Sequence, residues 1–226
     1  MKSYISTYTG KIKTIILLYA FSFAGLFAQP IVTKDLPQYL LSEFAEAEIL
    51  MKAGNYIGLN LNYNTVTQKM VFKQKGLLYD MVNPQEVDTV FLEERVFVIH
   101  DTVFLELVVN DKIPFFIQHK SDVSIKSKPS MSGTTQVSTS NFVTTANSAV
   151  VYFNQKLPDN FVVKSSNAYW VRNKDEMKAF INERQLLKIF PDIADQLKLF
   201  IKESNLKLNN MADFTRIAKY CNDQLK

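Results

Sequence analysis

The stretch VDTVFLEERVFVIHDTVFLELVVNDKIPFFIQHK, from Val87 to Lys120, decides the fold. Apolar and β-branched residues dominate it, and short polar groups interrupt the apolar runs. Such a pattern predicts short strands joined by tight turns, that is, an antiparallel meander. The hexapeptide DTVFLE occurs in it twice, at 88–93 and at 101–106. No further copy is recognisable, so a propeller or a solenoid is not indicated.

The spacing of the two copies indicates a register for the central strands. A two-residue turn at 100–101 places Arg95 opposite Glu106, a cross-strand pair of opposite charge worth up to about 1 kcal/mol. In this register both faces of the strands are apolar. We therefore expect helices or a second layer of sheet to cover them.

A second turn at 110–111 places Thr102 opposite His119, so that His100, Asp101 and His119 share one edge of the sheet. The chain has two histidines, and with an acid they form a candidate metal site or acid–base pair. The plainer interpretation is a polar turn and a strand-end side chain. We favour the plainer one because the cluster depends on an assumed register.

The carboxylates Glu93, Glu94 and Glu106 raise the hypothesis of a glycosidase, which needs two acids on either side of a cleft. Nothing in the sequence marks a cleft, and Glu93 and Glu94 fit a solvated turn or bulge. The motifs of serine hydrolases, zinc proteases and nucleotide-binding loops are absent from the sequence. We therefore predict no catalytic residue and no cofactor.

The first 28 residues have the pattern of a secretory signal. Lys2, Lys11 and Lys13 precede the apolar run TIILLYAFSFAGLFA, and the small residue Ala28 suits a cleavage site. We expect the exported chain to begin near Gln29. Beyond the signal, no apolar stretch approaches the roughly 20 residues of a membrane span.

Removal of the signal changes the charge of the chain. It takes three lysines from 26 basic residues, which leaves 23 against 22 acidic residues and a net charge of +1. A nucleic-acid partner would need a basic stripe, so this class of partner is not expected. The one cysteine, Cys221, cannot form an internal disulfide, and we interpret it as a buried structural thiol.

Strand patterns also occur outside the central stretch. Residues 46–63 alternate in the manner of a hairpin; AEAEILMKA at 45–53 also contains good helix formers, but we favour the hairpin. Residues 127–148 are rich in Ser, Thr and Asn, which is typical of a long surface loop. The remaining strands are expected at 69–73, 77–82, 87–99, 102–109, 112–120, 150–153, 161–164 and 168–172.

After Asn173 the apolar spacing becomes helical, and it predicts three helices. The first carries Met177, Phe180, Ile181 and Leu187; Phe190-Pro191 ends it and begins the second. Asn210 and Asp213 cap the third, whose apolar stripe includes Cys221.

The predicted fold class is therefore α+β. An N-terminal segment at 29–45 precedes an antiparallel β-meander of about 8–10 strands at 46–172. A three-helix segment at 173–226 packs against that meander.

Five stretches of the chain resemble a group of secreted proteins of Bacteroidota-type bacteria: LNYN at 61–64, VDTVFLEERVFV at 87–98, the Ser/Thr-rich loop, YWVRNKDEMKAF at 169–180 and QLLKIFPDIADQLKLFIKESNLKL at 185–208. The resemblance implies secretion and the order of sheet then helices, but no activity and no site residues. It also implies a modification, O-glycosylation at Asp-Thr followed by an aliphatic residue, which fits Thr102 and Thr89. Thr102, beside a turn, is the better acceptor.

We expect a secreted or envelope-associated protein that is not an enzyme and acts by binding or as a structural component. Its partner is then an unidentified protein or an apolar ligand of the cell envelope. The alternative is a periplasmic carrier that holds a lipid or another apolar ligand between sheet and helices. The third hypothesis is a metal-dependent or acid–base enzyme that uses His100, Asp101 and His119.

Overall fold

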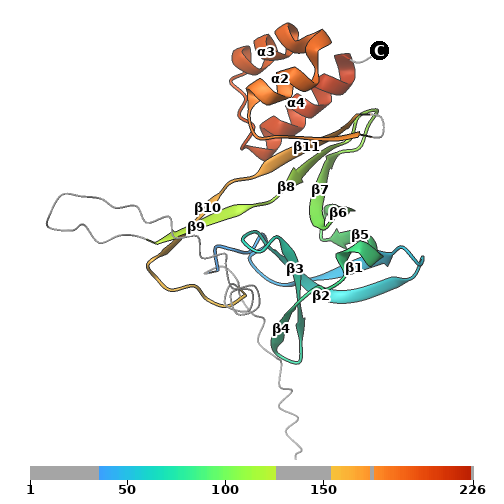
Figure 1. Cartoon of the computed structure of the whole chain (residues 1–226), viewed down its shortest axis with the longest axis vertical. Helices are drawn as coiled ribbons and strands as arrows, with labels where there is room; N and C mark the ends of the chain where they lie inside the picture. Colours follow the sequence, from blue (N-terminus) through green and yellow to red (C-terminus); the bar gives the residue numbers. More distant parts are fainter. Residues whose placement is uncertain (1–35, 126–153, 174–175, 225–226) are drawn as a thin grey trace, which may run out of the picture.

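The computed structural model describes residues 36–125, 154–173 and 176–224. Its fold is α+β, as predicted: a ten-stranded antiparallel sheet precedes three C-terminal helices (Figure 1). The strand order is β12-β11-β8-β7-β6-β5-β1-β2-β3-β4, and a two-stranded sheet contains β9 and β10. The strands are β1 (Ala45–Met51), β2 (Tyr56–Asn64), β3 (Lys69–Gln74), β4 (Leu77–Asp80), β5 (Val87–Leu92), β6 (Arg95–His100), β7 (Val103–Val109), β8 (Phe115–Gln118), β9 (Ser121–Ile125), β10 (Phe161–Ser165), β11 (Ala168–Asn173) and β12 (Glu176–Phe180).

Two meanders meet at the centre of the sheet. β1 pairs with β2 on one side, which confirms the predicted hairpin, and with β5 on the other. From there β2 to β4 continue one way and β6 to β8 the other. Tight turns are the reason for this order, since each joins strands that then pair directly. A short 3-10 helix (Pro84–Glu86) connects β4 to β5.

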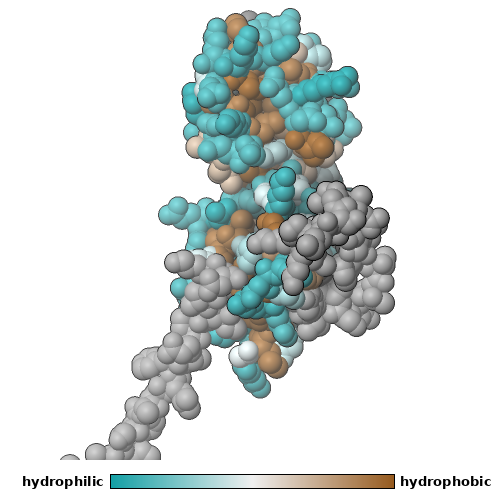
Figure 2. Space-filling model, turned by 90° about the vertical axis from the view of Figure 1, so that its left-hand side faces the viewer, coloured by the Kyte–Doolittle hydropathy of each residue, from teal (hydrophilic) through white to brown (hydrophobic). Residues whose placement is uncertain are grey.

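The sheet contributes to two hydrophobic cores. One gathers side chains of β1, β2, β3, β5, β6 and β7, among them Ile49, Tyr63 and Phe97. That half of the sheet curls: β3 approaches β7, and Ser121 N–H donates to the carbonyl of Thr65 at 3.0 Å. The other core lies between the sheet and the helices, which sit at one end of the molecule (Figure 1). Figure 2 shows that the molecule narrows below the helical end.

The helices are α2 (Glu183–Ile189), α3 (Ala194–Glu203) and α4 (Met211–Gln224), with a 3-10 turn (Pro191–Ile193) between the first two. The predicted break at Phe190-Pro191 is confirmed. The predicted cap is confirmed as well, because Asp213 N–H donates to Asn210 Oδ1 at 3.1 Å. Cys221 lies on the buried stripe of α4.

Two predicted elements were wrong. The stretch Glu176–Phe180 is not helical; it forms β12, the edge strand next to β11. Pairing with β11 outweighs the helix propensity of these residues, because propensity is weaker than tertiary context. The expected single strand at 87–99 is two strands, since Glu93 takes a positive φ of 53° and opens a tight turn between Leu92 and Arg95.

The register predicted for β6 and β7 was also wrong, by two residues. His100 pairs with Val103, so the turn is Asp101-Thr102 and Phe97 faces Glu106. The reason is local: Asp101 adopts a positive φ of 54°, which Asp tolerates better than most residues. A shift of two residues keeps each side chain on its predicted face.

Three predictions lie outside the described residues. They are the signal at 1–28, the Ser/Thr-rich loop at 127–148 and the strand at 150–153. The strand at 161–164 is confirmed as part of β10, and the strand at 168–172 as part of β11.

Candidate functional site

The candidate site lies on one row of directly paired residues that crosses the sheet. Paired residues in neighbouring strands lie side by side on the same face. At the centre of the row is Glu106, a charged residue between apolar and aromatic neighbours. From β1 to β12 the row contains Ile49, Val90, Phe97, Glu106, Ile117, Tyr169 and Phe180.

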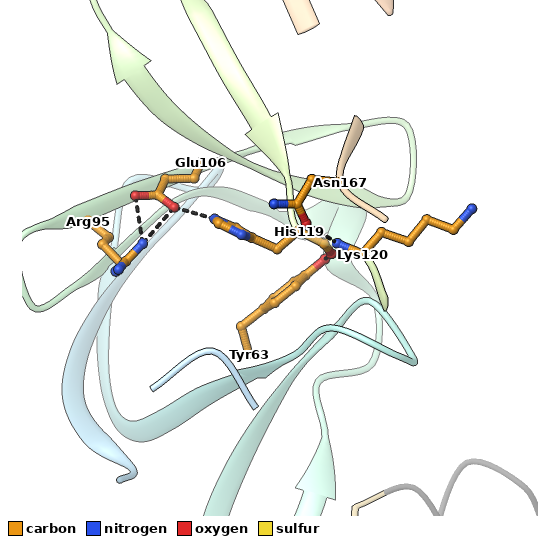
Figure 3. A network of polar contacts seen from close by, with 6 residues as sticks. All are labelled: Tyr63, Arg95, Glu106, His119, Lys120 and Asn167. Carbon is orange, nitrogen blue, oxygen red and sulfur yellow. Dashed lines mark hydrogen bonds and ion pairs between the residues drawn. The ribbon is translucent and has the colours of Figure 1, made fainter. Parts of the chain in front are cut away.

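Glu106 is 6% exposed and has two charged or ionisable partners (Figure 3). Arg95 Nη1 donates to both carboxylate oxygens, at 2.8 and 3.0 Å. His119 Nε2 bonds to the same carboxylate from the other side. Because an ionised carboxylate only accepts hydrogen bonds, this nitrogen carries the hydrogen. The predicted Arg95–Glu106 pair is thus confirmed, although the two residues are diagonal rather than opposite.

Tyr63 extends the network to the curled half of the sheet. Its hydroxyl donates to the carbonyl of His119 at 3.1 Å (Figure 3), and its ring stacks on Phe97 with 5.9 Å between centroids. Burial raises the pKa of Tyr63 well above its usual value of 10, so the hydroxyl stays a donor at any physiological pH. The network therefore connects β2, β6, β7 and the end of β8.

The proposed metal residues do not converge in the predicted way. His100 Nε2 is 3.9 Å from Asp101 Oδ2, and its ring contacts Trp170 at 5.1 Å between centroids. His119 instead bonds to Glu106. Within residues 36–125, 154–173 and 176–224, no group of three His, Cys, Asp or Glu side chains is placed to hold a metal ion.

The three acids of the glycosidase hypothesis lie along one groove. Glu93, Glu94 and Glu106 line an open groove of about 540 Å³ together with Arg95 and residues of α4. Glu106 is nevertheless engaged on both oxygens, whereas a general acid must exchange its proton with a substrate. Glu93 and Glu94 are exposed turn residues. The geometry favours a structural ion pair over an acid–base pair.

The sequence contained a signal for the His119–Glu106 contact. Glu106 occupies an inward position in the apolar run of β7, between Phe104 and Val108, and a buried carboxylate requires partners. Arg95 was found from the sequence and His119 was not, because the register of β8 depends on the loop before it. The ladder is irregular between Leu107 and Val109, which shifts that register.

Cys221 is fully buried, and burial raises the pKa of its thiol to about 12. A thiol of this kind is not a nucleophile at neutral pH, as predicted for a structural cysteine. Thr102 is exposed in its turn, whereas Thr89 is half-buried in β5 and donates to Asp88 Oδ1 at 2.8 Å. O-glycosylation at Thr102 or Thr89 stays a prediction.

Comparison with known protein families, with curated proteins and with solved structures gives no match. The resemblance to secreted Bacteroidota-type proteins therefore stays a prediction. None of the helices in the described part of the chain is long and apolar enough to cross a membrane.

Proposed function

We propose that the chain is an exported protein that is not an enzyme and that acts in the cell envelope by binding or as a structural component. The observation that carries the proposal is the state of Glu106. Its carboxylate has the burial that catalytic acids often have, but Arg95 and His119 already engage it. The network supports the sheet at the point where its two cores meet.

The packing between sheet and helices favours this function over that of a lipid carrier. Four aromatic rings occupy the interface: Phe115, Tyr169, Phe180 and Phe214. Tyr169 and Phe214 have centroids 4.7 Å apart, and Phe115 and Phe214 are 6.1 Å apart. Rings in mutual contact form a filled interior rather than an acyl-binding channel.

Export is tested by mass spectrometry of the tagged protein expressed in a bacterial host. The protein recovered from the periplasm or the medium is expected to lack residues 1–28. A matched chain that begins with Met followed by Gln29 should stay in the cytoplasm. Recovery of the intact chain from the cytoplasm, with its first 28 residues present, would contradict the proposal.

The absence of acid–base chemistry is tested with Glu106→Gln and a panel of 4-nitrophenyl glycosides. We expect no turnover from the wild-type protein. Turnover that disappears in a folded Glu106→Gln variant would show that the network is catalytic.

The structural role is tested with the triple variant Arg95→Met, Glu106→Leu, His119→Leu. Replacing a whole buried ionic cluster by apolar residues is often neutral or stabilising, whereas removing one member leaves its partners unpaired. Urea unfolding should therefore show a triple variant that is more stable than Glu106→Gln alone.

A further inference from the structure

A long two-stranded ribbon leaves the main sheet next to the helices. β8 and β9 form one arm, and β10 and β11 form the other. The pairs Gln118–Ala168 and Ser121–Ser165 belong to one unbroken register. At the break between them, Ser166 N–H donates to the carbonyl of Lys120 at 2.8 Å. The two arms therefore continue from the large sheet into the small one without a change of pairing.

Strand β12 pairs with one edge of this ribbon, but only along β11. It pairs with β11 from Tyr169 to Asn173. Hydrogen bonds alternate along an antiparallel pair, and Ser166 bonds inward to Lys120. The backbone N–H and C=O groups of Val163, Ser165 and Asn167 therefore point away from β9 and β8. They lie on the same edge of the ribbon that β12 pairs with farther along, at β11. No strand in the described part of the chain pairs with this edge of β10.

A cleft of about 480 Å³ adjoins the open edge. Ser165, Asn167 and Tyr169, which alternate along the ribbon, line one side of it. Aliphatic side chains of the helical part, including those of Ile201 and Leu206, line the other. The volume lies within the range of small-molecule and peptide side-chain pockets.

Several polar groups of the cleft are placed to donate hydrogen bonds. The side-chain oxygen of Asn167 accepts from Lys120 N–H, and that of Asn182 accepts from Gln185 N–H. Each asparagine therefore has its amide hydrogens left to offer. Lys207 adds an ammonium group, whereas Glu183 is the carboxylate that lines the cleft.

Tyr169 adds a further hydrogen-bond donor to the cleft. The residue as a whole is 4% exposed and lines the cleft, and its hydroxyl, which bonds to no described residue, stays accessible to solvent there. Burial also raises its pKa, so the hydroxyl keeps its proton. An acceptor group of a ligand in the cleft would receive a hydrogen bond from this hydroxyl.

We propose that this edge and cleft bind the C-terminal end of an extended peptide. The peptide adds to β10 as a parallel strand along Val163 to Asn167. It ends at the cleft, because β12 occupies the edge beyond. Its carboxylate meets the donors of Asn167, Asn182, Lys207 and Tyr169, and its last side chain, an aliphatic one, lies between Ile201 and Leu206. This inference rests on the proposed binding function and names the chemistry of the partner.

The test uses the exported protein, immobilised, and a pool of heptapeptides that end in Val, Leu or Ile. Peptides retained from the pool are identified by mass spectrometry, and the affinity of the best one is measured by fluorescence anisotropy. Amidation of its C-terminus is expected to weaken binding at least about tenfold, since charge-assisted hydrogen bonds are lost. N-terminal acetylation should have no effect.

Matched proline variants test the strand addition. Ser165→Pro removes an outward N–H and is expected to abolish binding, while Val123→Pro removes an N–H on the opposite edge of the ribbon and should leave the affinity unchanged. Lys207→Met should weaken binding about tenfold and Tyr169→Phe severalfold. Far-ultraviolet circular dichroism verifies that each variant is folded.

Three outcomes would overturn the inference. They are equal binding of the acid and the amide, unchanged affinity of folded Ser165→Pro, and retention of no peptide. Each of them leaves the proposed function standing, because export and the absence of turnover are measured separately.

Discussion

The two copies of DTVFLE have the same six letters and different environments. The first begins in β5 and ends with Glu93 in a turn; the second begins with Asp101 in a turn and ends with Glu106 inside β7. Phe91 of the first copy is 37% exposed, whereas Phe104 of the second is 2% exposed.

The difference arises from the position of each turn. Side chains alternate between faces along a strand, so a shift of one residue in phase exchanges the side chains that point to a given face. In the first copy Val90 and Leu92, the third and fifth letters, face the first core. In the second copy Phe104 and Glu106, the fourth and sixth letters, face that core, and Leu105, the fifth letter, is buried on the opposite face of the sheet. An identical hexapeptide therefore does not determine which of its side chains are buried.

The largest expected difference in stability is that between two phenylalanine variants, one in each copy. Phe104→Ala should lower the free energy of unfolding by about 3–5 kcal/mol, because it leaves a cavity among Tyr63 and its neighbours. Phe91→Ala, on the exposed side, should cost about 1 kcal/mol or less. Urea unfolding followed by fluorescence measures both, and equal losses would refute the assignment of opposite phases.

The two glutamates give the next largest difference. Glu106→Gln leaves Arg95 with a weaker partner in a buried site and should cost about 3 kcal/mol. Glu93→Gln, in a solvated turn, should change stability by less than about 0.5 kcal/mol. The comparison fails if both variants have the same unfolding midpoint in urea.

The smallest difference concerns the turn residues themselves. Glu93 and Asp101 have φ values of 53° and 54°, a region that costs L-residues about 1–2 kcal/mol. Glu93→Gly should therefore stabilise the protein by up to about 1 kcal/mol. Asp101→Gly should stabilise it by less, because Asp tolerates this conformation better. Differential scanning calorimetry resolves such shifts, and a loss of stability in both variants would contradict the turn assignment.

Much of the sheet could be predicted because period-two patterns fix faces even when the register is wrong. The Arg95–Glu106 pair was expected between opposite residues and is found between diagonal ones. An error of two residues leaves both side chains on one face, and the long side chain of Arg95 spans the remaining offset. The α4 stripe could be predicted for a similar reason, since helical spacing alone places Cys221 inward.

Other features depend on contacts that no local pattern contains. β12 is a strand because β11 lies beside it, although its residues suit a helix. His119 reaches Glu106 because the ladder shifts between Leu107 and Val109. The edge of β10 has no paired strand among the described residues because β12 pairs with β11 alone. The sequence alone did not indicate where β12 ends.

The bonds that close the curled half of the sheet have a consequence for folding. Tyr63 bonds to His119, and Thr65 bonds to Ser121 with 2.9 Å between hydroxyls; each pair spans 56 positions in the chain. Contacts between distant positions form late, because the intervening loop must be closed first. A chain that emerges from a ribosome or a translocation channel N-terminus first cannot complete its first core until residues 119–121 have followed. This core therefore stays incomplete until more than half of the sequence has emerged.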